Sequence, residues 1–447
     1  MEAWNLSGGN TWSTKVTRAI LVGVAFGGRP DGLDESLDEM AALAVTVDLK
    51  VVGTLTQSLT RANSSTFIGR GKGDELAGLC ADTHASLIVF NEELSPAQIR
   101  NLEEITTVRV ITRGDLILEI FSKRAQTRQA KLQVELATLR YQLPRLRHMW
   151  THLERQLGAR GARGGPGERQ LEVDRRLASA RIADLEQQLK KVKSQRSQQV
   201  GARKDMFTVA LVGYTNVGKS TLMNALAGTD LLVEDRLFAT LDATTRVLWL
   251  GNGQRVLLTD TVGFIDKLPC DLLDSFHATF EEVHTAHLLL HVVDGTSPSA
   301  ERQAEVVRDT LRRIGAVNTR VIHVLNKADQ LPASWNQNAL KKRWHPACLT
   351  SALTGAGLDD LKAAIEVEYR SERQSEVLLI ASRNDRNIVA FAYQHGAVLD
   401  TQYDDNSVEL RVLFERSVIG RLRQFCADQG SMVEIVETPN LPLTQNA

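Results

Sequence analysis

The stretch Gly213-Tyr-Thr-Asn-Val-Gly-Lys-Ser220 indicates the fold of this chain more directly than any other. It follows a short apolar run at 209–212 and precedes a helical pattern, which is the strand–loop–helix setting that the phosphate-loop motif GxxxxGK[ST] requires. Its glycines let backbone N–H groups converge on phosphates at a helix N-terminus. Lys219 supplies a positive charge for the β- and γ-phosphates, and the Ser220 hydroxyl is a hard oxygen ligand that suits Mg²⁺. We therefore expect a P-loop domain built on a parallel sheet.

Two motifs farther along the chain predict that the bound base is guanine. A strand candidate ends in Asn326-Lys-Ala-Asp329, and Thr350-Ser-Ala-Leu353 follows another strand-like segment. A carboxylate at Asp329 accepts from both N1–H and the 2-amino group of guanine, whereas adenine lacks the 2-amino group and leaves the charge unpaired. The stem of Lys327 would cover the base, and the Ala352 amide would bind its O6 atom.

A further motif concerns hydrolysis. Asp260-Thr-Val-Gly263 ends a strand candidate, so its carboxylate would hold the metal through water and the Gly263 amide would meet the γ-phosphate. Phe264 follows, where many small GTPases have a glutamine that orients the attacking water, so we expect slow turnover that a partner accelerates. Asn216 occupies the position that holds a monovalent cation in some GTPases, although an ordinary loop residue is the favoured interpretation. Lys219 and Asn216 are the candidate catalytic residues.

The segment Phe238-Ala-Thr-Leu-Asp242 lies between these motifs, where a mobile switch is expected. Thr240 is the candidate second hydroxyl ligand of Mg²⁺, ordered only while the γ-phosphate is present. Thr244 and Thr245 compete for this role on chemistry alone. The candidate metal ligands are therefore Ser220 and Thr240, and the candidate nucleotide-binding residues are Gly213, Tyr214, Thr215, Asn216, Val217, Gly218, Lys219, Ser220, Phe238, Ala239, Thr240, Leu241, Asp242, Asp260, Thr261, Val262, Gly263, Asn326, Lys327, Ala328, Asp329, Ser351, Ala352 and Leu353.

The composition is that of a globular protein with several domains. The 447 residues are about three times the length of a typical domain, and 43% of them are apolar. A formal net charge of -1 excludes a uniformly basic nucleic-acid binder but not a locally basic one. The four cysteines form no CxxC pair, which excludes a disulfide scaffold or thiolate zinc finger. Since the sequence has no long apolar run and no signal-peptide pattern, we expect a cytoplasmic protein without a transmembrane segment.

Residues 1–122 are expected to form an N-terminal α/β domain. Apolar runs alternate with helix-like stretches, a pattern typical of parallel βαβ units. The expected strands are 19–26, 49–55, 86–90 and 108–112, and the expected helices are 33–45, 74–83 and 96–105. The loop Gly69-Arg-Gly-Lys-Gly73 leads into one of these helices and could receive a phosphate there. A tight turn that uses glycine for positive φ is the favoured interpretation, because short glycine motifs match by chance.

Residues 123–204 are expected to form a basic helical hairpin. They contain 20 Lys/Arg against seven Asp/Glu, an excess of 13 positive charges that leaves -14 on the rest of the chain. Apolar residues recur at heptad spacing, as in two helices that bury one stripe against each other. Pro144 lies inside the first stripe and should kink or split that helix. The two stripes are Leu132, Leu136, Leu139, Leu143, Leu146, Trp150 and Leu153, then Ala178, Ile182, Leu185, Leu189 and Val192.

The expected tip of this hairpin is Gly158-Ala-Arg-Gly-Ala-Arg-Gly-Gly-Pro-Gly167, which is too rich in glycine to hold a helix. Arg160, Arg163 and Arg169 are spaced along and just beyond it. A solvated coiled coil with a flexible loop is the plain alternative, but the concentration of positive charge favours a polyanion partner. RNA suits this tip better than duplex DNA, because arginine planes stack on splayed bases while they bind phosphates.

The two remaining regions are the G domain, 205–372, and a C-terminal α+β module, 373–447. The module is expected to run strand 377–382, helix 385–395, strand 398–403, strand 408–414, helix 417–428 and strand 432–436. This βαββαβ order is that of a split βαβ unit, and we see no catalytic constellation in it.

With these motifs assembled, the whole chain resembles HflX, a family of bacterial GTPases that act in translation. The most specific segments are Phe67-Ile-Gly-Arg-Gly-Lys-Gly73, Leu94-Ser-Pro-Ala-Gln98, Lys131-Leu-Gln-Val-Glu-Leu136, Gly165-Pro-Gly-Glu-Arg-Gln170 and Asp260-Thr-Val-Gly-Phe-Ile265. The resemblance implies GTP and Mg²⁺ contacts at the residues named above, with Ser220 and Thr240 on the metal. It also implies binding to the large ribosomal subunit, with ribosome splitting in the GTP state and the glycine-rich loop near the peptidyl-transferase RNA.

We therefore expect a monomeric GTPase of low intrinsic rate that binds the large ribosomal subunit and splits or rescues ribosomes. Its rRNA contacts would include Arg160, Arg163 and Arg169; its cofactor would be Mg²⁺, with K⁺ as a second candidate cation. The alternative is a GTP-dependent regulatory switch that acts on a protein or an anionic membrane surface without a ribosomal role. A third hypothesis, an ATP-driven RNA remodeller, would use the N-terminal domain.

Overall fold

The computed structural model of the chain describes residues 17–27, 32–149, 166–199, 206–228, 238, 243–251, 253–268, 280–316, 318–332, 337–382, 385–404, 406–428 and 434–438. The chain forms two compact units. One comprises Met1–Arg246 with Leu257–Gly355, and the other comprises Val247–Val256 with Ala356–Ala447. Among the helices that the structure describes, none is both long and apolar enough to cross a membrane.

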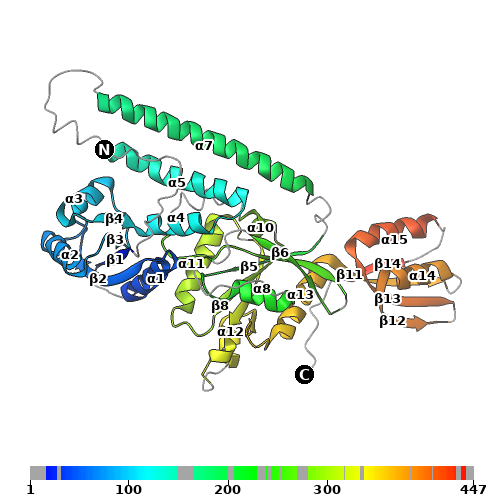
Figure 1. Cartoon of the computed structure of the whole chain (residues 1–447). Helices are drawn as coiled ribbons and strands as arrows, with labels where there is room; N and C mark the ends of the chain where they lie inside the picture. The colour runs from blue at the N-terminus through cyan, green and yellow to red at the C-terminus, as the bar shows by residue number, and fades with distance from the viewer. Residues whose placement is uncertain are drawn as a thin grey trace. The chain divides into compact units, whose positions relative to one another are not determined.

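The larger unit begins with a parallel sheet in the strand order β2-β1-β3-β4, which confirms the expected βαβ pattern. Alternate residues of its strands, among them Ile20 and Ile88, pack with Leu76 of α2 and Leu102 of α3 in one apolar core. On the same domain, α1 contacts both β1 and α4. The elements, visible in Figure 1, are β1 (Arg18–Phe26), α1 (Leu33–Thr46), β2 (Lys50–Leu59), α2 (Arg70–Thr83), β3 (Leu87–Phe90), α3 (Pro96–Thr106), β4 (Arg109–Thr112) and α4 (Arg113–Arg124).

One expected loop is instead the first turn of a helix. Gly69 is the N-cap of α2 with an extended backbone, and Arg70–Gly73 already belong to the helix. Glycines 69, 71 and 73 all lack a positive φ, so the expectation of a tight turn is wrong. The Gly69 amide donates to Gln57 Oε1 at 2.9 Å, and Lys72 pairs with Glu75. The amide that begins the helix and one of the two cations are thus engaged within the domain.

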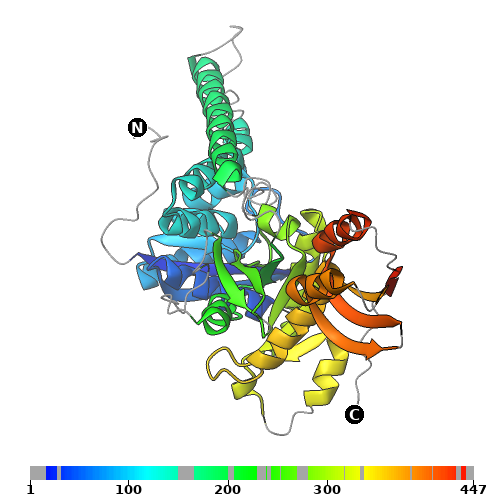
Figure 2. The same ribbon diagram turned by 90° about the vertical axis from the view of Figure 1, so that its right-hand side faces the viewer.

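Two long helices, α5 (Arg128–Met149) and α7 (Pro166–Gln199), run alongside each other (Figures 1 and 2). Ion pairs Arg140–Glu186 and Arg181–Glu135 link them at 2.6 and 2.8 Å. The seam between them buries four leucines, which confirms the heptad prediction for these residues. Leu143 is half-buried and outside this cluster, and the side chain of Leu146, with Trp150 and Leu153, is not described. The buried residues are Leu132, Leu136, Leu139 and Leu185, flanked by Ile182, Leu189 and Val192.

Two details of the hairpin differ from expectation. α5 continues through Pro144 to Met149, so the proline does not split the helix. Pro166 and Gly167, expected in the tip, begin α7, where proline is tolerated because the first N–H groups of a helix need no intrahelical partner. Arg169 therefore lies in α7, whereas Arg160 and Arg163 lie outside the described residues.

The G domain is built on a second sheet, in the order β10-β9-β8-β5-β7-β6. The strands β10, β9, β8, β5 and β7 are parallel. Residues 288–293 of β8 are all buried, which is typical of a strand covered on both faces. The elements are β5 (Thr208–Gly213), α8 (Lys219–Ala227), β6 (Thr244–Trp249), β7 (Arg255–Asp260), α10 (Glu281–His284), β8 (Leu288–Asp294), α11 (Ala300–Arg313), β9 (Arg320–Asn326), η2 (Ala328–Gln330), α12 (Gln337–Arg343) and β10 (Ala347–Leu349).

The smaller unit contains α13 (Leu358–Arg373) and an antiparallel sheet in the order β12-β13-β11-β14. α14 and α15 pack over Val377, Leu379, Leu410 and Val412 of this sheet. The expected βαββαβ order is confirmed, although the boundaries expected between regions, at 122, 204 and 372, stay predictions. The elements are β11 (Gln374–Ser382), α14 (Arg386–His395), β12 (Gly396–Tyr403), β13 (Ser407–Glu415), α15 (Arg416–Asp428) and β14 (Glu434–Thr438).

Candidate nucleotide-binding site

The carboxyl ends of three neighbouring or nearby parallel strands bring the sequence motifs together. The phosphate loop follows β5, Asp260 ends β7 and Asn326 ends β9, so all three lie at one edge of the sheet, where open α/β sheets bind ligands. Two loop glycines are required by close packing. A Cβ on Gly213 would lie 2.3 Å from the Val292 carbonyl oxygen, and one on Gly218 would lie 2.5 Å from Asn326 Nδ2.

Lys219 is buried at the start of α8, where its amine lies among backbone oxygens. Its Nζ atom donates to the carbonyls of Tyr214 at 2.7 Å and Gly213 at 3.2 Å. Burial lowers the pKa of Lys219 to about 8, because desolvation outweighs the nearby charge of Asp260. The amine therefore lies against the phosphate loop, as the sequence motif predicts. It releases its proton more readily than the amine of an exposed lysine does.

The oxygen atoms expected to serve Mg²⁺ converge. Ser220 Oγ donates to Asp260 Oδ2 at 2.6 Å, so a hydroxyl and a carboxylate meet at one point. Such hard oxygen donors fit Mg²⁺, which usually takes few protein ligands beside phosphate oxygens and water. Thr240, with Ala239, Leu241 and Asp242, lies outside the described residues. Thr245, one of the two alternatives, lies in β6. Its hydroxyl oxygen is 3.1 Å from that of Thr259, so this hydroxyl is engaged with another threonine.

The base-recognition motifs also meet. Asn326 is buried and donates through Nδ2 to the Val217 carbonyl at 2.9 Å, while its Oδ1 accepts from the Ala352 amide at 3.0 Å. It thereby ties the phosphate loop to the loop after β10. Asp329 Oδ1 accepts from Ser351 Oγ at 2.5 Å, which orients the carboxylate. The Ala352 amide is thus already a donor to Asn326, and its predicted contact with guanine O6 stays a prediction.

One ion pair at this site, between Lys327 and Asp294, belongs to no sequence motif. Lys327 has a left-handed backbone (φ 62°), and its amine lies 2.7 Å from Asp294 Oδ2 at the end of β8. Burial raises the pKa of Asp294, but hydrogen bonds from Lys327 and Thr296 outweigh it and hold the pKa below its usual range. Asp294 thus fixes the lysine stem that is expected to cover the base. Its only signal in the sequence is its place at the end of a buried strand.

The remaining predicted residues are placed as follows. Thr261 is buried and its hydroxyl donates to the Leu211 carbonyl at 2.6 Å, and Val262 and Val217 are buried as well. The Ala328 amide donates to the Thr350 carbonyl at 3.0 Å, whereas the side chain of Leu353 is 79% exposed. Asn216 is exposed with φ 60°, a conformation that asparagine tolerates better than most residues.

The segment after Asp260 is joined to the phosphate loop by a short parallel bridge. The Thr215 amide donates to the Phe264 carbonyl at 2.8 Å, and the Phe264 amide donates to the Gly213 carbonyl at 3.1 Å. The Phe264 side chain is 1% exposed and stacks on Phe280. It is therefore a core side chain and does not offer a group that could orient an attacking water.

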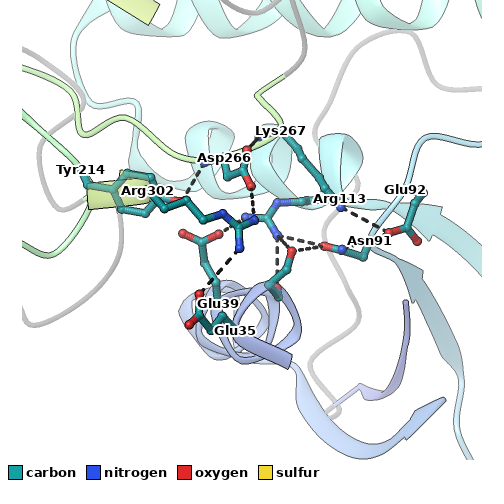
Figure 3. Close-up of polar contacts among 10 residues, drawn as sticks. Glu35, Glu39, Asn91, Glu92, Arg113, Tyr214, Asp266, Lys267 and Arg302 are labelled. Atoms are coloured by element: carbon teal, nitrogen blue, oxygen red, sulfur yellow. Dashed lines mark hydrogen bonds and ion pairs between the residues drawn. The ribbon is translucent and has the colours of Figure 1, made fainter. Parts of the chain in front are cut away.

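The phosphate loop also contacts the N-terminal domain, which no motif suggested (Figure 3). Arg302 of α11 lies 3.0 Å from Asp266 and 3.7 Å from Glu35 of α1, and burial together with the charge of Glu39 raises the pKa of Tyr214. Lys267 pairs with Glu92 at 3.3 Å. These residues are far apart in sequence and follow no pattern, so only the structure reveals them.

Comparison with known proteins assigns the family. Three family models match: "GTP-binding GTPase N-terminal" over residues 34–122, "GTP-binding GTPase Middle Region" over 124–203 and "50S ribosome-binding GTPase" over 208–327. A GTPase HflX from Caldanaerobacter subterraneus subsp. tengcongensis is 42% identical over 413 residues, which cover 91% of this chain and 93% of the relative. The chain belongs to the HflX GTPase family.

Other HflX proteins are similarly close. The GTPase HflX of Escherichia coli (strain K12) is 38% identical over 425 residues, 93% of this chain and 97% of the relative. Among solved structures, a GTP-binding protein from the archaeon Sulfolobus solfataricus in complex with GDP has a TM-score of 0.42 and 22% identity, and the match covers 79% of this chain and 98% of that one. The resemblance to HflX seen in the sequence is confirmed, and this HflX protein is a GTP-hydrolysing enzyme.

Proposed function

We propose that this HflX protein binds the large ribosomal subunit in its GTP state and splits or rescues ribosomes. The observation that carries the proposal is the combination, in one chain, of a nucleotide site and a strongly basic hairpin. The family model that matches the G domain describes a 50S ribosome-binding GTPase, which supports the same partner. A cytoplasmic, monomeric protein is part of this proposal.

The basic surface of the hairpin supports rRNA as the partner. Its seam is apolar and buried, while the basic residues Arg175, Arg176, Lys190 and Lys191 of α7 are exposed. A row of exposed cations on a helix attracts phosphate groups by counterion release, whatever their base sequence. We assign the closest rRNA contacts to Arg160, Arg163 and Arg169 near the glycine-rich segment.

The base of the hairpin is bound to the N-terminal domain, so a conformational change in that domain can be transmitted to the hairpin. Arg145 of α5 lies 3.0 Å from Asp115 of α4 and 2.6 Å from Glu93. The Tyr141 hydroxyl donates to Glu93 at 2.7 Å, and a Cβ on Gly114 would lie 2.4 Å from that hydroxyl oxygen. Burial and the neighbouring carboxylates raise the pKa of Tyr141, so its hydroxyl stays a donor.

For catalysis, we propose that Lys219 and the loop amides hold the phosphates and that Ser220, Asp260 and Thr240 serve Mg²⁺, directly or through water. The metal would neutralise charge that develops on the phosphate oxygens. Because Phe264 offers no polar group, turnover would depend on the ribosome or on K⁺ beside Asn216. Equal turnover in Na⁺ and K⁺ would exclude the K⁺ proposal.

Sedimentation tests the ribosomal role directly. Purified protein is added to cell extract with a non-hydrolysable GTP analogue, GDP or a non-hydrolysable ATP analogue, and layered on a sucrose gradient. We expect co-migration with large subunits in the GTP analogue alone. Absence from the subunits in every lane would favour the regulatory switch acting on another partner, and co-migration that requires the ATP analogue would favour the RNA remodeller.

The same gradients test the arm. Replacing Arg160 and Arg163 with alanine should weaken subunit binding and flatten its dependence on salt, since each lost phosphate contact lowers the salt slope by about one. Arg312→Ala removes an exposed cation from α11 instead and serves as the matched control. Binding that responds equally to both changes would exclude the hairpin as the specific RNA contact.

A further inference from the structure

Tyr214, the second residue of the phosphate loop, has its polar atom outside the nucleotide site. The side chain is 7% exposed, and its hydroxyl oxygen accepts from the Asp266 amide at 2.8 Å. The Glu39 carboxylate of α1 lies beside the tyrosine, and burial together with the charge of Glu39 raises the pKa of this hydroxyl. Since the hydroxyl oxygen accepts from Asp266, its own proton is available to this carboxylate, which only accepts. Tyr214 thus lies where the phosphate loop, residues 264–266 and α1 come together (Figure 3).

On the side of the N-terminal domain, Glu39 is held by a buried cation. Arg113 is 1% exposed and pairs with Glu39, and it also donates to Asn91 Oδ1 at 2.9 Å and to the carbonyl and hydroxyl oxygens of Ser36 at 3.3 Å. A buried guanidinium is stable only while its acceptors stay in place, so this cluster resists rearrangement. The Glu39 carboxylate is therefore a fixed point for the tyrosine.

On the side of the G domain, the tyrosine completes a set of hydrogen bonds that holds residues 264–266. The bridge between Phe264 and the phosphate loop supplies two of them, and the Asp266 amide supplies the third. Gly263 comes immediately before this segment and is tightly packed: a Cβ there would lie 2.9 Å from Thr215 Cγ2 and 3.0 Å from Lys219 Nζ. The hydrogen bonds that hold residues 264–266 therefore also fix the position of the Gly263 backbone relative to the Lys219 amine.

Neighbouring contacts reinforce the same attachment. The guanidinium of Arg302 lies between Asp266 and Glu35, and a Cβ on Gly32 would lie 2.0 Å from one of its nitrogens. Phe238, the first residue of the expected switch, packs edge-on against Phe121 of α4 with ring centroids 4.7 Å apart. Residues on both sides of the site are therefore in contact with the N-terminal domain.

We propose that Tyr214 is a positioning residue for GTP hydrolysis, and that its hydroxyl, held by Glu39, fixes the backbone of residues 264–266 so that the Gly263 amide meets the γ-phosphate. The proposal rests on the GTPase activity of the family and on the expected contact of Gly263, and is independent of the ribosomal role. Burial together with the charge of Glu39 raises the pKa of Tyr214, so the hydroxyl keeps its proton in the neutral range.

A positioning role for Tyr214 predicts different effects on GDP binding and on GTP turnover, whereas a purely structural role does not. GDP has no γ-phosphate, so its affinity should not depend on where Gly263 lies. GTP turnover should depend on it, because that amide would stabilise charge on the phosphoryl group in the transition state. Loss of the hydroxyl should therefore lower kcat and leave GDP binding unchanged.

The test compares Tyr214→Phe with Tyr369→Phe in the full-length protein without ribosomes. Tyr369 is an equally buried tyrosine whose hydroxyl donates to Glu415 at 2.9 Å in the other unit, which makes it a matched control. We expect Tyr214→Phe to lower kcat about five- to tenfold, the size of one lost hydrogen bond. KM and the Kd for GDP should change less than about twofold, and the control should show no change in kcat.

A second variant tests the link to the N-terminal domain. Glu39→Gln keeps one acceptor oxygen but must share it between Arg113 and the tyrosine, so its kcat should fall between those of the wild type and Tyr214→Phe. The double variant should match Tyr214→Phe, because no hydroxyl remains for residue 39 to hold. An additive loss, a rise in kcat, or a parallel loss of GDP affinity in Tyr214→Phe would overturn the proposal.

Discussion

At the scale of single residues, the predicted nucleotide site contains a buried lysine whose pKa lies below its usual value. Lys219 is buried beside the phosphate loop, and desolvation lowers its pKa to about 8 despite the charge of Asp260. If Lys219 holds the phosphates as proposed, the amine must be protonated to do so, and nucleotide and proton are expected to bind together. The same burial that lowers the pKa also removes competing water, which strengthens the attraction between the ammonium group and a phosphate.

This coupling predicts a pH dependence for GDP binding. Below about pH 8 the amine is already protonated, and affinity should change little; above it, affinity should fall by up to about tenfold per pH unit, as expected for uptake of one proton. Calorimetry or fluorescence titration between pH 7 and 9 measures the slope. Lys219→Ala should bind GDP more weakly throughout and with a flatter profile, and an equally steep profile in that variant would assign the proton to another group.

How far single residues could be predicted depended on whether they belong to a local motif. The motif residues lie at or just after the carboxyl ends of parallel strands, and the structure brings them together at one edge of the sheet. They are Ser220, Asp260, Asn326 and Ser351. Glu39 lies beside Tyr214 although more than 170 positions separate them, and such a pairing leaves no periodic or spacing signal. Tertiary contacts of this kind are set by the packing of whole domains.

At the scale of elements, the hairpin shows what a heptad pattern determines and what it leaves open. The pattern correctly predicts which faces of α5 and α7 meet, because burial of one apolar stripe decides the pairing. It does not give the helix ends. Pro144 was expected to kink or split α5, but the helix continues through it, with Tyr141 and Arg145 on either side bound to the N-terminal domain. Likewise, the glycines at 69–73 looked like a loop, whereas the turn they form is the start of α2.

A leucine pair on α7 tests the seam. Leu185 is fully buried between the helices and Leu177 is 52% exposed on the same helix. Leu185→Ala should destabilise the hairpin by about 2–5 kcal/mol, and Leu177→Ala by less than about 0.5 kcal/mol. Hydrogen exchange of peptides from α5 and α7 should accelerate only in the first variant. Equal exchange in the two variants would mean that the seam does not hold the hairpin together.

At the scale of the whole molecule, one description covers the larger unit. The predicted guanine-nucleotide site lies at the edge of the G sheet, the segment beside it contacts the N-terminal domain, and that domain anchors the base of a basic hairpin. Ion pairs connect the G domain with the N-terminal domain and that domain with the hairpin. The central claim is that the identity of the nucleotide in this site decides whether the hairpin engages the large subunit.

Exchanging the base specificity tests that claim most directly. Asp329→Asn replaces an acceptor with an amide donor, which suits the 2-oxo group of xanthine and not the 2-amino group of guanine. We expect the wild type to co-sediment with purified large subunits only in a non-hydrolysable GTP analogue, and Asp329→Asn only in the corresponding xanthosine analogue. If the variant binds subunits equally with either analogue, or with the guanine analogue alone, the nucleotide site does not control the arm as proposed.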